Sequence, residues 1–192
     1  MKTTLMMLCL ALVSGAAFAQ HDHGGGQGVP MHSKKEQETH LHRAAPVFQQ
    51  QLADVFMASL HLKEAFVSSD TEKVLAIIPE IRNLIAKVDM TQLKDEALMD
   101  WMGYLKTLNE STDQISNSKD LAVQRKAFAS FSDALYKSIK MFGVAGMTAY
   151  YTYCPMANNN AGAYWLSNSK EIRNPYFGNE MLTCGKVKET LQ

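Results

Sequence analysis

Residues 117–143, NSKDLAVQRKAFASFSDALYKSIKMFG, decide the fold of this chain. After the opening polar break, large apolar residues recur every three or four positions: Leu121, Phe128, Phe131, Leu135, Ile139 and Phe142. That spacing places them on one face of an α-helix. Gly143 follows the last of them, and glycine is common just beyond a helix C-terminus. The stretch therefore predicts an amphipathic helix whose apolar face must be buried against other helices.

Two earlier stretches have the same period. The first begins at Pro46, and its apolar positions are Phe48, Leu52, Val55, Phe56, Leu60 or Leu62, and Phe66. The second has the stripe Val74, Ile77, Ile78, Ile81, Leu84, Ile85 and Val88. Ser69 and Glu72 have the spacing of a capping box that opens this second helix. Pro79 falls inside its stripe, so we expect a kink or a restart there.

A third amphipathic helix is expected from about Thr91 to Ile115. Its inward positions are Leu93, Leu98, Trp101, Met102, Leu105 and Leu108. Four such helices joined by short polar breaks predict a mainly α fold, an antiparallel four-helix bundle over about residues 46–142.

The last quarter of the chain, about residues 147–192, has a different pattern. It is aromatic and rich in turn residues, which predicts an irregular segment with short extended pieces. Large aromatic side chains are costly to leave in water. We therefore expect this segment to pack back on the bundle through Tyr151, Tyr153, Trp165 and Phe177, so that residues 46–192 form one domain.

The first 45 residues are expected to lie outside that domain. Residues 1–19 have the basic start, short apolar run and Ala17-Phe18-Ala19 ending of a secretory signal peptide, which predicts cleavage after Ala19 and export to the periplasm. Residues 20–45 are rich in Gly, His and charge, so we expect a disordered tail. No other stretch is long and apolar enough to cross a membrane.

The charge balance and the scarcity of catalytic groups exclude two function classes. Lys and Arg number 19, and Asp and Glu also number 19. Such a neutral chain is not expected to bind nucleic acid, which requires a basic surface. A nucleophilic cysteine needs a base, and His61 is the only histidine on a predicted helix. We therefore expect a binding protein rather than an enzyme.

Four sulfur atoms in the last quarter form the candidate site. Cys154 and Met156 lie two positions apart, and Met181 and Cys184 lie three apart. Thiolate and thioether ligands together favour Cu(I), while a zinc site is less expected because it requires more Cys or His ligands. A disulfide between Cys154 and Cys184 explains the cysteines equally well, although it leaves the two methionines unexplained.

Histidines of the tail are candidate auxiliary ligands. His21, His23, His40 and His42 form two His-x-His pairs. Imidazole is a common ligand of copper and zinc. The pairs could therefore bind metal loosely, or they could simply belong to a solvated linker.

The motifs YYTYCPMANNNAGAYWLS, EIRNPYFG and MLTCG, within about residues 150–189, resemble an exported domain family common in Bacteroidetes. Its members occur alone or as C-terminal extensions of periplasmic adaptor subunits of copper and silver efflux pumps. This resemblance implies a soluble periplasmic Cu(I) chaperone or buffer that works beside such an adaptor. A disulfide-closed helical interaction module without metal is the alternative.

Overall fold

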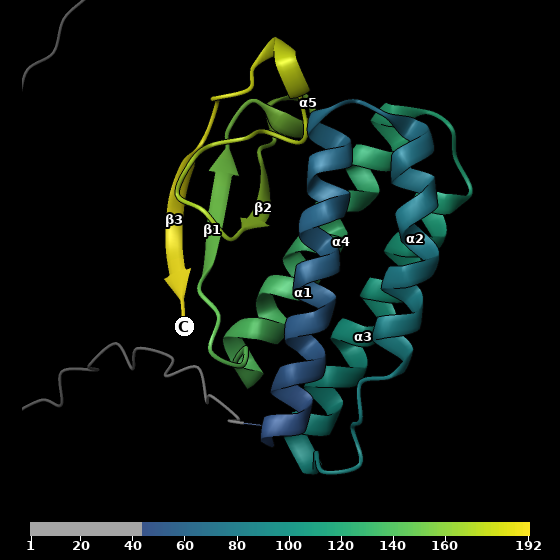
Figure 1. Cartoon of the computed structure of the whole chain (residues 1–192), viewed down its shortest axis with the longest axis vertical. Coiled ribbons are helices and arrows are strands. Elements are labelled where there is room, and N and C mark those ends of the chain that lie inside the picture. Colours follow the sequence, from purple (N-terminus) through teal and green to yellow (C-terminus); the bar gives the residue numbers. More distant parts are fainter. Residues whose placement is uncertain (1–43) are drawn as a thin grey trace, which may run out of the picture. The chain divides into compact units, whose positions relative to one another are not determined.

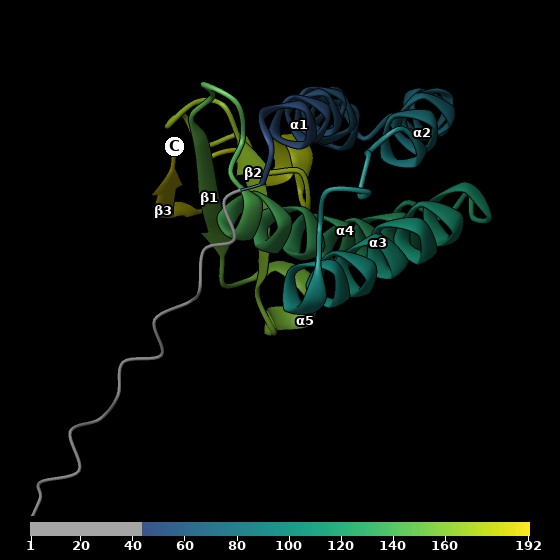
Figure 2. The ribbon, with the colours of Figure 1, turned by 90° about the horizontal axis from the view of Figure 1, so that it is seen from below.

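Four long helices and a small sheet make up the part of the chain that the computed structural model describes, residues 44–192 (Figure 1). The helices are α1 (Pro46–Val67), α2 (Thr71–Ala86), α3 (Asp95–Ser116) and α4 (Leu121–Phe142). Short connections join them in an antiparallel bundle, with α1 and α2 in one layer and α3 and α4 in the other (Figure 2). The mainly α, four-helix prediction is therefore confirmed. Among the helices of residues 44–192, none combines the length and apolarity needed to span a membrane.

Local capping chemistry sets where the helices begin and end. The carboxylate of Asp70 accepts a hydrogen bond from the backbone N–H of Lys73 at 3.0 Å and caps α2. The predicted capping box of Ser69 and Glu72 is therefore wrong by one residue. Asp120 caps the start of α4 in the same way. Helix α4 ends at Phe142, and Gly143 follows it as the C-cap with a φ of 85°, as predicted. Aspartate is among the best N-cap residues because its carboxylate satisfies free backbone donors.

Three further predicted details differ from the structure. Helix α3 begins at Asp95 rather than at about Thr91. Pro79 lies inside α2, and the helix is a single element through it. Met102 is 46% exposed instead of facing inward, because it lies at the edge of the apolar face of α3. The loss of one inward position leaves the bundle core intact.

The bundle core is rich in aromatic contacts at both ends. At one end, Phe48, Trp101 and Phe142 meet with ring centroids 5.0–6.2 Å apart. At the other end, the rings of Phe66 and Phe128 lie 4.8 Å apart. All five are at most 2% exposed. Such rings bury large apolar areas, so they account for much of the free energy that holds the helices together.

The last quarter forms a sheet where the sequence predicted only short extended pieces. Its strands are β1 (Ala149–Cys154), β2 (Ala163–Ser167) and β3 (Lys186–Leu191), with the short helices α5 (Ala157–Asn160) and η1 (Gly178–Glu180) between them. The sheet is antiparallel, in the order β2-β1-β3. The segment is therefore more regular than the sequence predicted. The pairing of β1 with β3 could not be read from local patterns, because the two strands are more than thirty residues apart in the chain.

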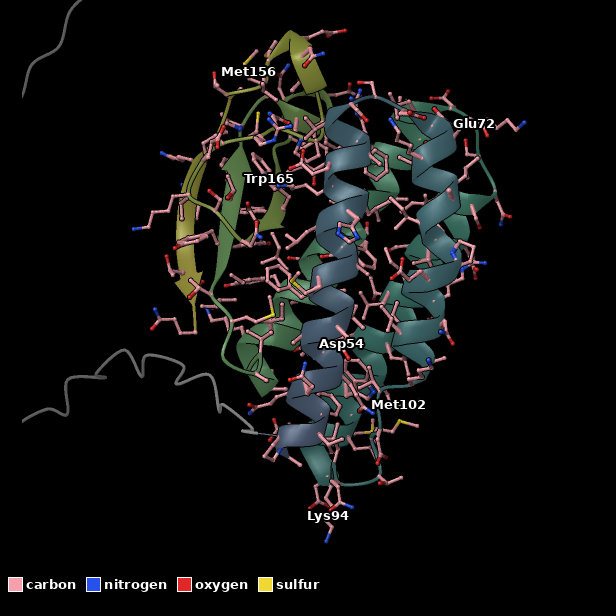
Figure 3. All side chains as sticks on the ribbon, viewed as in Figure 1. Asp54, Glu72, Lys94, Met102, Met156 and Trp165 are labelled. Atoms are coloured by element: carbon pink, nitrogen blue, oxygen red, sulfur yellow. The ribbon has the colours of Figure 1, made fainter. Side chains whose placement is uncertain are left out.

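Aromatic side chains attach the sheet to the bundle. Trp165 of β2 is 1% exposed and lies between the sheet and the helices (Figure 3). Its ring meets that of Tyr176 at 6.0 Å, and Tyr176 meets Phe128 of α4 at the same distance. Tyr151 stacks on Tyr136 of α4 at 3.6 Å. The predicted burial of Tyr151 and Trp165 is confirmed, whereas Tyr153 and Phe177 are only partly buried.

Two arginines add polar links between the loop after β2 and the helices. Arg125 of α4 donates to the carbonyl oxygens of Pro175 at 2.8 Å and Phe66 at 3.1 Å. Arg173 donates to both carboxylate oxygens of Glu64 in α1, at distances of 2.8–3.2 Å. Burial raises the pKa of Glu64, but hydrogen bonds from Arg173 and Lys63 outweigh it and hold the pKa below its ordinary value of 4.5.

The Arg173–Glu64 pair is expected to make stability depend on pH. A carboxyl with a lowered folded-state pKa stabilises the protein above its unfolded pKa, and this contribution is lost as the pH falls through the folded pKa. Arg173→Gln should lower the free energy of unfolding by up to about 1 kcal/mol at neutral pH, because the pair is half-exposed and screened by solvent. The difference should shrink at a second, acidic pH below the folded-state pKa of Glu64, where its carboxylate is protonated.

Urea unfolding of wild type and variant at the two pH values measures this difference. Lys106→Gln, which removes an exposed pair 3.9 Å long within α3, is the matched control. If Arg173→Gln lowered the free energy of unfolding equally at both pH values, packing of the Arg173 side chain rather than its charge would account for the loss.

Candidate functional site

The two cysteines of the described region lie side by side. Cys154 is the last residue of β1, and Cys184 lies just before β3. Because β1 and β3 are antiparallel neighbours that pair Tyr153 with Lys186, their adjacent ends bring both cysteines to one place. The two Sγ atoms are 3.0 Å apart, although thirty positions separate the residues in the sequence. Cys154 is fully buried and Cys184 is partly exposed.

Asn174 holds the backbone on the Cys184 side. Its side chain is fully buried and donates from Nδ2 to the carbonyl oxygen of Cys184 at 2.8 Å. Its backbone N–H donates to the carbonyl oxygen of Leu182, also at 2.8 Å. Asn174 lies within the motif EIRNPYFG, but nothing local in the sequence shows that its amide is buried. Its role as an anchor for Cys184 was therefore missed.

Gly185 allows the chain to pass close to Trp165 directly after Cys184. Its φ is 149°, and a Cβ atom there would lie 2.7 Å from Cη2 of Trp165. Any other residue would push the tryptophan or the strand away. The close approach keeps Cys184 against the end of β1.

The distance between the sulfurs lies between that of a disulfide bond and that of two sulfurs bound to one metal ion. A disulfide bond is about 2.05 Å long, so the sulfurs would have to approach by about 1 Å to form one. Two sulfurs bound to one metal ion, with metal–sulfur bonds of about 2.3 Å, lie roughly 3.8–4.6 Å apart. Metal binding would therefore require a separation of similar size in the opposite direction. Either change is small for a strand end and a loop.

Both cysteines hydrogen-bond to each other rather than to a positive group. The pKa of Cys184 is raised by its hydrogen bond with Cys154 and by burial. In residues 44–192, no Lys, Arg or His side chain donates a hydrogen bond to either sulfur. A thiolate at this place therefore has no hydrogen bond from a positive side chain of residues 44–192 to stabilise it.

The two methionines of the predicted site both line a neighbouring surface cavity. Met156 and Met181 both line a cavity of about 680 Å³, which Tyr176 and Phe177 also border. Neither cysteine is among its lining residues. Met156 is 43% exposed, at the end of the sheet where β1 leads into α5 (Figure 3). The structure thus brings the two predicted thiols together and places the two methionines at a cavity that neither cysteine lines.

Three consecutive asparagines follow Met156 in a left-handed conformation. Asn158, Asn159 and Asn160 have φ angles of 52°, 56° and 64°. This conformation is unfavourable for ordinary residues, and asparagine tolerates it better than most. The backbone N–H of Asn160 donates to the carbonyl oxygen of Met156 at 3.2 Å and closes the turn. The turn presents Met156 at the cavity rim and returns the chain to β2.

The other predicted ligands do not join this site. His21, His23, His40 and His42 lie outside the described residues. His61 is exposed on α1. Within residues 44–192, no group of three or more His, Cys, Asp and Glu side chains could hold a metal ion. The predicted site thus consists of two thiols that meet and two methionines that line the neighbouring cavity.

Comparison with known proteins gives a match to one family over the helices. No curated protein and no solved structure matches the chain. The family match runs from the middle of α1 to just beyond α4, so it covers most of the bundle. The sheet and its cysteines, on which the resemblance seen in the sequence rests, lie beyond it. Over residues 55–146 this chain is thus similar to a domain family described as "Protein of unknown function (DUF3347)".

Proposed function

We propose that this protein binds Cu(I) through Cys154 and Cys184 and serves as a copper chaperone or buffer in the cell envelope. The supporting observation is the 3.0 Å separation of two sulfurs that come from distant parts of the chain. The buried Asn174 and the close packing at Gly185 position that pair. A pair held in this way can bind one ion between two elements of the sheet.

The chemistry of the donors favours Cu(I) over zinc. Thiolates and thioethers are soft ligands and select a soft ion. Structural zinc sites almost always use four Cys or His ligands. Cu(I) is stable with two thiolates, so the paired cysteines suffice for it. Two thiolates and Cu(I) carry a net charge of minus one, which is less costly to hold at a partly buried position than two free thiolates.

The cellular setting of the proposal rests on the sequence. The N-terminal residues have the pattern of an export signal, which supports a periplasmic location. The motifs around the cysteines resemble domains attached to periplasmic adaptors of copper and silver efflux pumps. The proposed partner is therefore such an adaptor, to which the protein would deliver Cu(I).

A disulfide-closed interaction module is the second candidate. The same sulfur separation supports it, because a contraction of about 1 Å joins the two atoms. The closed loop of about thirty residues would add roughly 3–4 kcal/mol in the chain-entropy model. An oxidising compartment favours this bond. The two candidates compete for the same sulfurs, so one titration separates them.

A competition titration with a coloured Cu(I) chelator, performed anaerobically on the reduced full chain, tests the proposal. Reduced protein should withdraw one Cu(I) per chain and should then resist alkylation at both cysteines. Protein oxidised to the disulfide should withdraw none at this affinity. A chain with His21, His23, His32, His40 and His42 changed to Ala controls for metal held by the tail and should keep the tight site. Reduced protein that fails to compete would leave the disulfide module as the function.

A further inference from the structure

Positive and apolar side chains together line the surface cavity beside the sheet. The cavity measures about 680 Å³, and α4, α5 and η1 supply most of its lining. Its charged lining residues are Arg125, Lys126 and Glu180. Their charges sum to plus one at neutral pH, so the cavity favours a ligand with a single negative charge.

Arg125 is partly buried, and its charge has no carboxylate partner. Within residues 44–192, none of the ion pairs includes Arg125 or Lys126. The guanidinium donates from Nε and Nη2 only to neutral oxygens, those of Pro175, Phe66 and Ser69. Burial lowers the pKa of Arg125, because its charge is partly removed from water. A carboxylate bound in the cavity would provide the counter-charge and accept a charge-assisted hydrogen bond.

Apolar side chains line the same cavity and are exposed to water. Val123 is 48% exposed and Met156 is 43% exposed. Met181 and Phe177 also line the cavity and are partly exposed. Covering such apolar area with an apolar ligand removes it from water, which is favourable. The lining therefore suits a molecule that carries an apolar group beside its negative charge.

The left-handed asparagine turn adds neutral donors to the lining. Residues 158–160 all border the cavity, and their side chains are exposed. An amide can donate to a carboxylate without adding charge. The first turn of α4 provides no such donors, because Asp120 already accepts hydrogen bonds from the backbone N–H groups of Ala122 and Val123. Binding of an anion would therefore depend on side chains rather than on the end of the helix.

We propose that this cavity binds a small organic monocarboxylate, with the carboxylate held by Arg125 and Lys126 and the apolar group packed against the two methionines. The volume lies within the range of about 300–1,000 Å³ that is usual for small-molecule sites. Neither cysteine lines the cavity, so the site is distinct from the thiol pair and does not depend on copper.

Titration of the full chain with 3-phenylpropanoate tests the site, because the phenyl ring of this probe shifts nearby methyl signals in NMR spectra. The methyl signals of Met156 and Met181 should shift and reach saturation. The signal of Met99, which is 74% exposed on α3 and outside the cavity, should stay unchanged. The neutral 3-phenylpropanamide should bind at least about tenfold more weakly, since it lacks the charge that pairs with the guanidinium.

Lys126→Glu tests the charge of the cavity without disturbing the contacts of Arg125. Lys126 is exposed, and its reversal changes the summed charge of the lining from plus one to minus one. Affinity for 3-phenylpropanoate should fall about tenfold, because an attraction is lost and a repulsion is added. Lys94→Glu is the matched control, since it changes the net charge equally at the opposite end of the bundle from Met156 (Figure 3). It should bind the probe within about twofold of wild type.

Three results would overturn the site. The first is a titration in which the methyl signals of Met156 and Met181 show no saturable shift. The second is equal affinity for the acid and for its neutral amide, which would mean that the positive charges take no part. The third is an equal affinity of the Lys126→Glu and Lys94→Glu variants, which would place the probe elsewhere on the protein.

Discussion

Cys184→Ser is expected to lower the affinity for Cu(I) by more than about a hundredfold, since replacing even an outer-shell partner of a metal ligand costs 10–100-fold. Serine retains the size of cysteine but provides a hard, protonated oxygen in place of a soft thiolate. Only one thiolate would remain, on the buried Cys154. The ion would then have to be held by that single charge and by neutral donors. Competition against a Cu(I) chelator measures the loss directly.

Cys154→Ala should have the same effect through the other sulfur. Alanine is chosen at this position because Cys154 is fully buried, and a serine hydroxyl there would be costly without a partner. Thr183→Ser, at the exposed neighbour of Cys184, is the matched control and should bind as wild type does. Circular dichroism must show folded protein in all three variants. Equal Cu(I) affinity in the cysteine variants and the control would refute the thiol site.

Trp165→Ala is expected to produce the largest loss of stability in the C-terminal sheet. The side chain is 1% exposed and fills the space between β2, Tyr176 and the glycine that follows Cys184. Removing such a buried ring costs about 3–5 kcal/mol, which for a domain of this size is a fall of roughly 6–20 °C in the melting temperature. Thermal unfolding followed by circular dichroism gives the result.

Tyr150→Ala on the same sheet is the control for the loss of an aromatic ring as such. Tyr150 is only partly buried, and its ring meets the ammonium group of Lys170 at 5.9 Å. Its removal should cost at most about 1 kcal/mol. A Trp165→Ala protein that melts within a few degrees of the Tyr150→Ala protein would mean that the sheet contributes little to the stability of the bundle.

Local patterns in the sequence determined the helical part of the fold. Apolar residues at helical spacing, polar breaks and Gly143 are each properties of a few neighbouring residues, and they predicted four helices and most of the core. Local signals failed only at details. Asp70 rather than Ser69 caps α2, since neighbouring residues all have side chains able to cap, and Met102 lies at the edge of the apolar face where spacing alone cannot decide burial.

The candidate site, too, was predictable from the sequence only in part. Residue chemistry alone identified Cys154, Met156, Met181 and Cys184 as soft donors, because softness is a property of the side chain. That the sulfurs of Cys154 and Cys184 meet was not predictable, since it depends on the pairing of β1 with β3 and on the buried amide of Asn174. Such contacts join positions that are far apart in the chain. Their formation is decided by the packing of the whole domain, so only the tertiary structure could show them.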